Sequence, residues 1–507
     1  MKTLKELFRK IPEARFAGAD AENCRPESLL TDSRRVVPGA LFFAMDGLRT
    51  SGSVFAADAV KRGACAVVSR ERLDLPKNIA QVAVPDVAQA VALVAREFFD
   101  NPAGAFPLVG VTGTNGKTSV TSLVRFLMAK QTSAPWGLIG TVRYELGRRS
   151  IPSYKTTPES LDLMSLFAEM RDASCAGAAM EVSSHAINQK RVCALPFSVV
   201  AFTNLTQDHM DYHGNMENYF AVKSRLFDGS QGAFPQAAVI NADDVYGQKL
   251  LEKLPPQTRA VPFGLYGGNA EGFFAENVLL GPGGSEFTLN CPTGKFFVKT
   301  QLPGDYNVSN VLCALALVGA LGGNVEQAAK DVAAFAGVPG RMERVPENPF
   351  PFDVFVDYAH TDDALSNALG MLKKIARGRV LVVFGCGGNR DRGKRPKMVR
   401  AVQKFADFAW ATSDNPRKES PEQIFEDMKT GVTAPEKIVF EPDRRRAIGL
   451  ALDAAREGDC VLIAGKGHET YQEFADVTLP FDDKAVAQEL LALLAHRTGS
   501  RSQVCSR

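Results

Sequence analysis

The stretch Val109-Gly-Val-Thr-Gly-Thr-Asn-Gly-Lys-Thr-Ser119 decides how the middle of this 507-residue chain folds. An apolar run at residues 106–111 enters a glycine-containing turn, and a helical pattern follows over residues 120–130. Strand, glycine-rich turn, lysine, hydroxyl residue and helix, in that order, are typical of a phosphate-binding loop. Backbone N–H groups and the helix N-terminus face the phosphates there, while the lysine reaches the terminal phosphates and the hydroxyl can hold Mg²⁺. The sequence therefore predicts a nucleoside triphosphate site, although Val111 stands where the consensus has its first glycine.

The segments around this loop predict an α/β protein of about three domains, at a prior of about 150 residues each. The first 100 residues are typical of a small α/β unit. Pro/Gly-rich connections at 101–107 and 334–341 mark the two boundaries, which gives domains at 1–100, 101–336 and 337–507. We expect a P-loop ATPase-like parallel sheet in the central domain and a dinucleotide-fold-like third domain.

Short apolar runs mark the expected strands of the two larger domains. Such runs suit buried parallel strands, and ligands of open parallel sheets bind at the carboxyl ends of those strands. Polar clusters come directly after the runs, which places candidate sites at these ends. The runs are 178–182, 199–203 and 237–240 in the central domain, and 352–356, 380–384, 408–412 and 460–464 in the third.

Composition narrows the class of protein. A formal net charge of +2 gives no electrostatic reason to expect binding to nucleic acid or to a membrane surface. The nine cysteines are scattered and form no C-x-x-C pair, which favours a reducing compartment over a disulfide framework or a zinc site. No apolar stretch is long enough for a membrane-spanning helix. We therefore expect a cytoplasmic protein.

Histidines and a carboxylate stand out among the polar clusters. Five of the six histidines lie in them, at positions 185, 209, 213, 360 and 468. Imidazole suits phosphate contacts, metal ligation and proton transfer. Glu181 ends an apolar run and is a candidate for holding the Mg²⁺ that bridges the β- and γ-phosphates, with a buried structural ion pair as the alternative. The run Asp208-His-Met-Asp-Tyr-His213 favours a metal or phosphate site over a simple polar turn.

Cationic side chains are harder to interpret from the sequence. Lys223 lies in a helical pattern at 217–227, where spacing alone predicts a solvated surface charge. Arginines at 390, 392 and 395 and Lys394 share a glycine-rich loop, and Arg417 lies in another. Because arginine forms bidentate pairs with carboxylates and phosphates, these loops suit a zwitterionic ligand together with Asp414 and Glu469. A solvated basic loop is the alternative.

Taken together, the motifs resemble the Mur ligases, a family of ATP-dependent amide-forming enzymes (acid–amino-acid ligases, or peptide synthases). The resemblance covers nearly the whole chain. Two third-domain runs, Gly385–Arg395 and Asp414-Asn-Pro-Arg417, resemble the members that add meso-2,6-diaminopimelate to UDP-N-acetylmuramoyl-L-alanyl-D-glutamate in peptidoglycan synthesis. The other motifs are Thr112-Gly-Thr-Asn-Gly-Lys-Thr118, Thr156-Thr-Pro158, Glu181-Val-Ser-Ser-His185, Asn204-Leu-Thr-Gln-Asp-His209, Lys223-Ser-Arg-Leu-Phe227, Asn241-Ala-Asp-Asp244, Asn307-Val-Ser-Asn310, Gly340-Arg341 and Asp357-Tyr-Ala-His360.

The resemblance implies an acyl-phosphate mechanism, ATP as substrate, Mg²⁺ as cofactor and a carbamylated Lys223. It assigns the first domain to the UDP substrate, the central domain to ATP and the third to the amino acid. The implied catalytic residues are Lys117, Lys223 and His209. The implied ATP-binding residues are Gly113, Thr114, Asn115, Gly116, Lys117, Thr118, Ser119, Asn307, Arg341 and Asp357. The implied metal-binding residues are Thr118, Glu181, His209 and carbamylated Lys223.

Two further sets of contacts are implied by the resemblance. The implied UDP-substrate residues are Thr31, Ser33, Leu48, Arg49, Thr50, Thr156, Thr157, Ser183, Gln189 and Arg191. The implied diaminopimelate residues are Arg390, Asp414, Asn415, Pro416, Arg417, Gly465 and Glu469. The chain departs from the family pattern at residues 51–53, at Lys155 and at Asp362.

Three alternatives remain beside this interpretation. The same ligase could add L-lysine, although lysine-adding relatives differ at the position of Arg417. A folylpolyglutamate synthetase shares the phosphate loop, but the complete N-terminal unit with Asp32-Ser-Arg34 argues against it. The intact set Lys117, Glu181, Lys223 and His209 argues against a non-catalytic nucleotide-binding regulator. We expect small-molecule partners only and a monomer.

Overall fold

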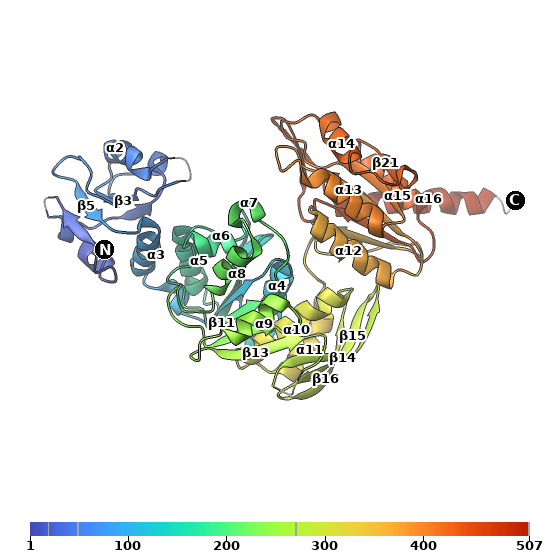
Figure 1. Ribbon diagram of the computed structural model, residues 1–507, viewed down its shortest axis with the longest axis horizontal. Coiled ribbons are helices and arrows are strands. Elements are labelled where there is room, and N and C mark those ends of the chain that lie inside the picture. Colours follow the sequence, from blue (N-terminus) through green and yellow to red (C-terminus); the bar gives the residue numbers. More distant parts are fainter. Residues whose placement is uncertain (19, 48–49, 269–270, 505–507) are drawn as a thin grey trace. The chain divides into compact units, whose positions relative to one another are not determined.

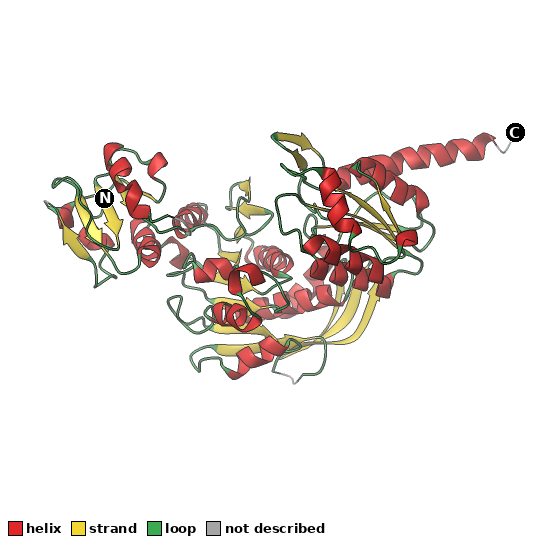
Figure 2. Ribbon diagram, turned by 45° about the horizontal axis from the view of Figure 1, so that its top comes forward, coloured by secondary structure: helices red, strands yellow, loops and turns green. Residues whose placement is uncertain are grey.

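The structure, a computed structural model, describes residues 1–18, 20–47, 50–268 and 271–504 (Figure 1). The chain divides into two compact units. The first unit contains Met1–Phe273 and Cys313–Ala328, and the second contains Phe274–Leu312 and Ala329–Arg507. The predicted α/β class is confirmed, because helices alternate with largely parallel sheets through most of the chain (Figure 2).

The first sheet belongs to the N-terminal part of unit 1. Its strand order is β1-β5-β4-β3-β2, with β1 antiparallel to β5 and the other pairs parallel. Leu41 and Phe43 pack toward α3, whereas Phe42 between them packs toward α2, so both faces of the sheet are buried. The elements are α1 (Leu4–Leu7), β1 (Arg15–Ala17), β2 (Ser28–Leu30), β3 (Ala40–Phe43), α2 (Ala56–Lys61), β4 (Ala66–Ser69), β5 (Ala80–Ala83) and α3 (Val87–Phe98).

The central sheet of unit 1 carries the phosphate loop. Its order is β13-β12-β11-β6-β10-β7-β8-β9, and the strands from β13 to β7 are parallel. All three predicted strands after the loop are present as β10, β11 and β12. The strands are β6 (Leu108–Thr112), β7 (Trp136–Ile139), β8 (Arg143–Glu145), β9 (Ser150–Pro152), β10 (Gly177–Glu181), β11 (Val199–Phe202), β12 (Ala237–Asn241) and β13 (Arg259–Gly264).

Helices connect these strands and bury their apolar faces in a shared core. Because β6, β10 and β11 are neighbours and parallel, the polar segments after them meet at one edge of the sheet. The helices are α4 (Lys117–Thr132), α5 (Ser160–Asp172), α6 (Ser184–Asn188), α7 (Met210–His213), α8 (Met216–Ser224) and α9 (Val245–Glu252).

An antiparallel meander interrupts the alternation that the sequence led us to expect in the middle of the chain. Strands β14 (Phe273–Gly281), β15 (Gly284–Cys291) and β16 (Gly294–Thr300) pair in sequence order, with a register shift between Glu276 and Leu279. Every second residue of β15 is buried, which is the signature of a sheet with one solvated face. Helices α10 (Asp305–Ala320) and α11 (Val325–Asp331) come next in the chain.

The sheet of unit 2 has the order β17-β18-β22-β19-β20-β21, and every pair except β17–β18 is parallel. Helices α12 to α14 pack on one face, and α15 and α16 pack on the other (Figure 1). This doubly wound arrangement matches the predicted dinucleotide-like fold. The strands are β17 (Glu343–Arg344), β18 (Asp353–Asp357), β19 (Val380–Cys386), β20 (Phe408–Ser413), β21 (Ile438–Phe440) and β22 (Cys460–Ala464).

A hairpin comes after the last strand of this sheet. It consists of β23 (Tyr471–Phe474) and β24 (Val477–Pro480), which pair antiparallel. The helices of unit 2 are α12 (Asp362–Ile375), α13 (Lys394–Phe405), α14 (Pro421–Lys429), α15 (Arg444–Ala454) and α16 (Asp483–Val504). No helix in the described part of the chain is both long and apolar enough to span a membrane.

Candidate functional site

The phosphate loop connects β6 to α4 and requires glycine at two positions. Gly113 has a φ of +146° and Gly116 a φ of +87°, which favour glycine. A Cβ at Gly113 would lie 1.9 Å from the Oγ1 of Thr203, so no larger residue fits there. Val111 is buried inside β6, before the turn begins. The departure from the consensus therefore lies in the strand and leaves the turn intact.

The segment after β11 holds the loop in place. The backbone N–H of Thr114 donates to the carbonyl of Asn204 at 2.9 Å, and the N–H of Asn115 donates to the Asn204 Oδ1 at 2.9 Å. The Thr203 hydroxyl donates to the carbonyl of Asn115 at 2.6 Å. These bonds tie the predicted loop residues to the neighbouring strand before any ligand binds, which reduces the entropic cost of ordering the loop around a phosphate.

Two lysines reach this loop from different helices. Lys117, the first residue of α4, donates through Nζ to the carbonyl of Thr114 at 2.8 Å. Lys223, on α8, is 1% exposed, and its Nζ lies 4.7 Å from the centre of the Tyr219 ring. Burial, and next the Lys117 charge, lower the pKa of Lys223 well below its usual value. The expectation of a solvated surface charge at Lys223 was therefore wrong, because helical spacing does not reveal which face of α8 packs inward.

Glu181 ends β10 and is almost fully buried. Its Oε2 accepts a hydrogen bond from the Thr118 hydroxyl at 3.0 Å and another from the Thr141 hydroxyl at 3.1 Å. The backbone N–H of Thr141 donates to Oε1 at 2.7 Å. The structure thus brings Glu181 to the start of α4, as the sequence predicted. It adds Thr141, which sequence reasoning missed because a single threonine after a strand carries no distinguishing signal.

The predicted muramoyl-dipeptide residues in this unit form a connected group next to Glu181. The Thr157 hydroxyl donates to the Glu181 carbonyl at 2.8 Å and accepts from the Ser183 N–H at 3.1 Å. Arg191 donates to the Thr157 carbonyl at 2.9 Å and to the Gln189 side chain at 2.5 Å. The group thus places hydroxyl, amide and guanidinium side chains next to the backbone of Glu181.

Three histidines and two tyrosines form an aromatic cluster beside the loop. The rings of His185 and His209 are 4.9 Å apart, and the His213 ring stacks on Tyr219 at 4.8 Å. The His213 Nε2 lies 2.9 Å from the hydroxyl of Ser184. Burial, and next the neighbouring histidines, lower the pKa of His213 to about 4. His213 is therefore a neutral packing residue at physiological pH.

His209 is the member of this cluster that was predicted to bind metal. Its side chain is 46% exposed, and its Nε2 lies 3.4 Å from Asp208. Burial of the ring lowers its pKa, so the neutral form able to ligate a cation dominates. Within the described ranges, no group of three or more histidine, cysteine, aspartate or glutamate side chains is arranged to hold a metal ion.

The predicted UDP-substrate residues of the first sheet differ in how far they are exposed to solvent. Ser33 is buried and begins a 3-10 turn, and Asp32 accepts hydrogen bonds from Arg34, which lowers the pKa of Asp32 to about 2. Thr31 and Thr50 are exposed. Leu48 and Arg49 lie outside the residues that the structure describes.

In unit 2 the predicted amino-acid residues converge at the carboxyl ends of β20 and β22. The Asn415 side chain donates to the Glu469 carboxylate at 2.9 Å. Gly465 has a φ of +116°, and a Cβ there would lie 2.6 Å from the Asp414 Oδ2. Lys466 is fully buried and donates to Asn415 at 3.1 Å and to Glu469 at 3.2 Å. Burial raises the pKa of Glu469 above its usual value.

Arg417 has a left-handed backbone with a φ of +55°. Its Nε lies 2.9 Å from Glu473 on β23, and its Nη1 donates to the Gly388 carbonyl at 3.0 Å. A Cβ at Gly387 would lie 3.1 Å from Arg417 and 3.9 Å from Arg390, so both arginines adjoin the same loop. Lys466 and Glu473 were not predicted as site residues, although Lys466 lies between the predicted residues Gly465 and Glu469.

Two basic residues of the glycine-rich loop have a structural role. Arg395 is 0% exposed and pairs with Glu419 and Asp427, each at 2.7 Å. Arg392 pairs with Asp427 at 2.9 Å. The alternative of a solvated basic loop therefore does not describe Arg395, which joins α13 to α14. A Cβ on Gly388 would lie 1.8 Å from the Pro416 carbonyl, so the two predicted loops are packed together.

The remaining predicted ATP residues lie before the sheet of unit 2 and at the end of β18. Asp357 accepts from the backbone N–H groups of Met342 at 2.7 Å and Ala359 at 2.8 Å, and burial raises its pKa. The Arg341 guanidinium lies 5.0 Å from the centre of the Tyr358 ring. Asn307 is buried near the start of α10, where its side-chain amide donates to the Pro303 carbonyl at 2.8 Å.

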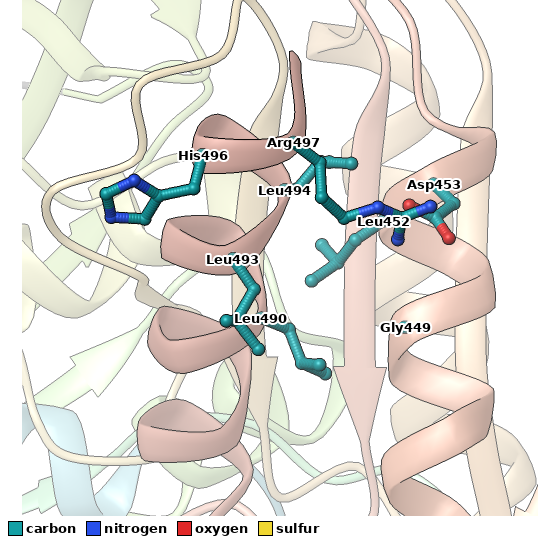
Figure 3. A pocket seen from close by; sticks show the side chains of 8 residues that line it. All are labelled: Gly449, Leu452, Asp453, Leu490, Leu493, Leu494, His496 and Arg497. Atoms are coloured by element: carbon teal, nitrogen blue, oxygen red, sulfur yellow. The ribbon is translucent and has the colours of Figure 1, made fainter. Parts of the chain in front are cut away.

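A separate groove lies between α15 and α16 (Figure 3). Leu452 and Leu490 project into the space between the two helices. The groove is lined by the last turns of α15, whereas Arg444, at the start of α15, donates to the Ala464 carbonyl at the carboxyl end of β22. The groove therefore lies away from the strand carboxyl ends, where open parallel sheets bind their ligands. We therefore do not assign the groove to the candidate site. Its lining consists of Gly449, Leu452, Asp453, Leu490, Leu493, Leu494, His496 and Arg497.

Three family models match the chain. They are the Mur ligase family, catalytic domain, over residues 27–99, the Mur ligase middle domain over 111–318, and the Mur ligase, glutamate ligase domain, over 340–467. Each matched segment covers most of the strands of one of the sheets described above, so the match extends over most of the candidate site in both units.

Similar proteins of known name share most of their length with this chain. The UDP-N-acetylmuramoyl-L-alanyl-D-glutamate--2,6-diaminopimelate ligase of Solibacter usitatus is 42% identical, covering 96% of this chain and 98% of the relative. The protein of that name from Geobacillus thermodenitrificans is 45% identical, covering 91% and 94%. A solved structure of a ligase with this name has a TM-score of 0.69 and 32% identity, covering 96% and 99%.

Proposed function

Because this chain belongs to the Mur ligase family, we propose that it is an ATP-dependent amide ligase that adds meso-2,6-diaminopimelate to UDP-N-acetylmuramoyl-L-alanyl-D-glutamate in peptidoglycan synthesis. One observation carries the proposal. A phosphate loop with two lysines and a buried carboxylate lies in the same chain as a cluster of polar side chains that includes Arg417 and Glu469. The first can activate a carboxylate with ATP, and the second can bind an amino acid.

The reaction has two steps. The γ-carboxylate of the D-glutamate residue attacks the γ-phosphorus of ATP, which gives an acyl phosphate and ADP. The amine of diaminopimelate then attacks the acyl carbon and expels inorganic phosphate. Lys117 and the N-terminus of α4 neutralise the transferring charge, and positioning supplies much of the remaining rate enhancement. We assign residues 113–119 to the phosphates, and Asn307, Arg341 and Asp357 to the rest of the nucleotide.

The residues at the start of α4 suit Mg²⁺. The Thr118 hydroxyl and the Glu181 carboxylate meet there, and Mg²⁺ prefers oxygen ligands and is held through one or two carboxylates together with substrate phosphates. When bound, the ion would neutralise phosphate charge. We propose His209 as a further ligand, with the neutral ring that its lowered pKa provides.

The environment of Lys223 favours covalent modification of its amine. Its amine is buried and its pKa is strongly lowered; the acceptors of its hydrogen bonds among the described residues are neutral, the Gly113 carbonyl at 2.9 Å and the Thr112 hydroxyl at 3.4 Å. A neutral amine can add CO₂ to form a carbamate and release one proton. That reaction replaces a buried cation with a carboxylate-like group, which would hold a second Mg²⁺ beside the phosphate loop.

The acceptor substrate has two proposed contact regions. The first sheet would bind the UDP end through Thr31, Ser33, Leu48, Arg49 and Thr50. The dipeptide would lie against the connected group Thr156, Thr157, Ser183, Gln189 and Arg191. This group adjoins Glu181, so the reacting carboxylate would be delivered to the phosphate loop.

Diaminopimelate differs from lysine by a second carboxylate at the far end of its side chain. Arg417 is the proposed partner of that zwitterionic end, with Arg390 beside it, and Asp414, Asn415, Pro416, Gly465 and Glu469 complete the pocket. A buried carboxylate needs a fixed cation, and Glu473 and the Gly388 carbonyl hold the Arg417 guanidinium in one orientation. L-lysine would leave this arrangement unpaired, which argues against the lysine-adding alternative.

The test is ADP release by the purified full-length protein. ADP should form only when ATP, Mg²⁺, the UDP-dipeptide and an amino acid are all present, and it should match the amount of UDP-tripeptide made. A nucleotide-binding regulator would release no ADP under any of these conditions. We also propose that the protein is a cytoplasmic monomer. The eight free cysteines among the described residues support the proposed compartment, and they have no bearing on the oligomeric state.

A further inference from the structure

We propose that Thr141 is a positioning residue that couples the acceptor subsite at Thr156 to the nucleotide subsite at Glu181, so that the two substrates bind cooperatively. This inference rests on the proposed function, because it takes Thr156 as a contact of the UDP-dipeptide and Glu181 as a group of the nucleotide site. Thr141 lies just after β7, and neither β7 nor Thr141 belongs to a motif singled out in the sequence.

Both the backbone and the side chain of Thr141 make hydrogen bonds to the Glu181 carboxylate. The backbone N–H donates to the Glu181 Oε1 at 2.7 Å, and the hydroxyl donates to Oε2 at 3.1 Å. The same hydroxyl lies 3.1 Å from the hydroxyl of Thr156. The Glu181 Oε2 also accepts from Thr118, the second residue of α4. A continuous chain of hydrogen bonds therefore runs Thr118–Glu181–Thr141–Thr156.

The number of protons available decides which hydroxyl donates the hydrogen bond between Thr141 and Thr156. A threonine hydroxyl has one proton to donate and two lone pairs with which to accept. The Thr141 proton is directed to the Glu181 carboxylate, so Thr156 must donate the hydrogen bond between the two hydroxyls. Thr156 then faces the acceptor substrate with lone pairs only. Its matching substrate group is a donor, an amide N–H or a sugar hydroxyl, and not a carboxylate.

The Glu181 carboxylate is tightly held, so a change at one end of this chain of hydrogen bonds affects the other end. A Cβ at Gly140 would lie 2.5 Å from the Glu181 Oε1, so backbone encloses that oxygen. The Glu181 backbone carbonyl is bound as well, by Thr157 at 2.8 Å. A nucleotide that draws on Thr118 or Glu181 therefore changes the hydrogen bond that Glu181 offers to Thr141, and with it the polarisation of Thr156.

Cooperative binding provides the test, because coupling between two ligands is reciprocal and needs no turnover. The affinity of UDP-N-acetylmuramoyl-L-alanyl-D-glutamate is measured by calorimetry on the full-length protein, without nucleotide and with saturating Mg²⁺ and an ATP analogue that carries a β,γ-methylene bridge. In wild type we expect the analogue to tighten binding by about fivefold or more, the lower end of typical coupling factors. Thr141→Val keeps the shape and the N–H but loses the hydroxyl, and should reduce the factor to below about twofold.

Three further variants complete the design. Thr141→Ser restores the hydroxyl and should restore the factor, which a loss of packing alone would not do. Thr156→Val removes the other end of the bond and should also abolish the coupling, even if Thr141→Val fails to fold. Thr132→Val, an exposed threonine near the end of α4, should behave as wild type.

A wild-type factor near one, or an undiminished factor in Thr141→Val or in Thr156→Val, would overturn the role of Thr141. A wild-type protein that binds the ATP analogue but not the UDP-dipeptide would instead overturn the proposed function. The two failures are therefore distinct.

Discussion

Lys117 and Lys223 donate hydrogen bonds to the same acceptor, the carbonyl oxygen of Gly113, at 3.0 and 2.9 Å. Two ammonium groups at one oxygen repel each other, and only Lys223 is also fully withdrawn from water. Its pKa is lowered well below the usual value as a result, with burial as the larger cause and Lys117 as the second. The buried Lys223 amine therefore gives up its proton more readily than an exposed lysine would, which makes it the better candidate of the two for covalent modification.

Lys117→Ala should abolish ligation while leaving the fold intact. The variant removes the cation that meets the developing phosphoryl charge, and loss of one such preorganised donor costs about 10²–10³-fold in rate. Steady-state ADP release gives the rate, and thermal unfolding shows whether the protein is folded. Lys130→Ala, in the last turn of the same helix, is the matched control and should keep wild-type activity. A folded Lys117→Ala enzyme with wild-type turnover would refute the assignment of the loop.

Lys223→Met should be inactive and at least as stable as wild type near pH 7. Because the folded-state pKa of Lys223 is lowered, the unfolded chain binds more protons between that pKa and the usual value of 10.5. Wild-type stability should therefore rise with pH across this window, and the rise should be smaller in Lys223→Met. Denaturant unfolding at pH 7 and pH 9 in CO₂-depleted buffer measures the difference, and identical pH dependence would contradict the burial argument.

The carbamate makes a separate prediction. Depleting CO₂ should lower the activity of wild type, and bicarbonate should restore it, because the modification is reversible. Short carboxylic acids should restore part of the activity of Lys223→Ala by occupying the place of the carbamate. An unimpaired Lys223→Ala enzyme would exclude this role.

The contrast between these lysines shows what the sequence could and could not predict. The place of Lys117 at the start of a helix could be predicted, because glycines, a flanking strand and a helical pattern mark its loop. Lys223 was misread from spacing, because helix α8 has no clear apolar stripe and its burial depends on contacts with a loop 110 residues away. Only the resemblance to a family singled out Lys223 before the structure did.

The same difference between local sequence signals and tertiary contacts applies to whole strands. Apolar runs predicted β10, β11, β12 and the main strands of the third sheet, since buried parallel strands are continuously apolar. The antiparallel strands β14 to β16 were missed because their alternating pattern is weaker than a continuous run. Thr141 and Glu473 could not be predicted, because their partners are distant in the sequence and no local pattern encodes those contacts.

Glu419→Gln should lower the free energy of unfolding and make it depend less on pH in the acid range. Hydrogen bonding to the buried Arg395 is the main cause that lowers the pKa of Glu419 to about 2. A carboxylate with a depressed folded-state pKa contributes stability that is present above its unfolded value and is lost as pH falls toward about 2. We expect the variant to lose about 1.5–3 kcal/mol at pH 7, the range for hydrogen bonds to charged groups.

The measurement for Glu419 is denaturant unfolding at pH 7, 5 and 3. Wild type should lose more stability than Glu419→Gln between pH 5 and pH 3. Glu422→Gln is a suitable control, because Glu422 lies in the first turn of α14, close to Glu419 in the sequence, and bonds only to Ser420 among the described contacts. An equal loss in wild type and in Glu419→Gln would show that the Arg395 pair does not set the acid response.

Arg417→Ala should reduce discrimination between diaminopimelate and lysine more than it reduces the use of ATP. The variant removes the cation that Glu473 and Gly388 hold in place, so the KM for diaminopimelate should rise steeply, whereas the KM for ATP should change little. Lys418→Ala, an adjacent exposed lysine, is the matched control. A variant that still strongly prefers diaminopimelate would remove Arg417 from this role.

The most direct test of the central claim is the ratio of kcat/KM for meso-2,6-diaminopimelate to kcat/KM for L-lysine in the wild-type ligase, with the UDP-dipeptide and ATP saturating. A site built to pair a polar group rejects an analogue that lacks it by about 10⁴-fold or more, because its own groups are left unpaired. We predict a ratio of about that size in favour of diaminopimelate. Equal use of the two amino acids, or a preference for lysine, would contradict the account.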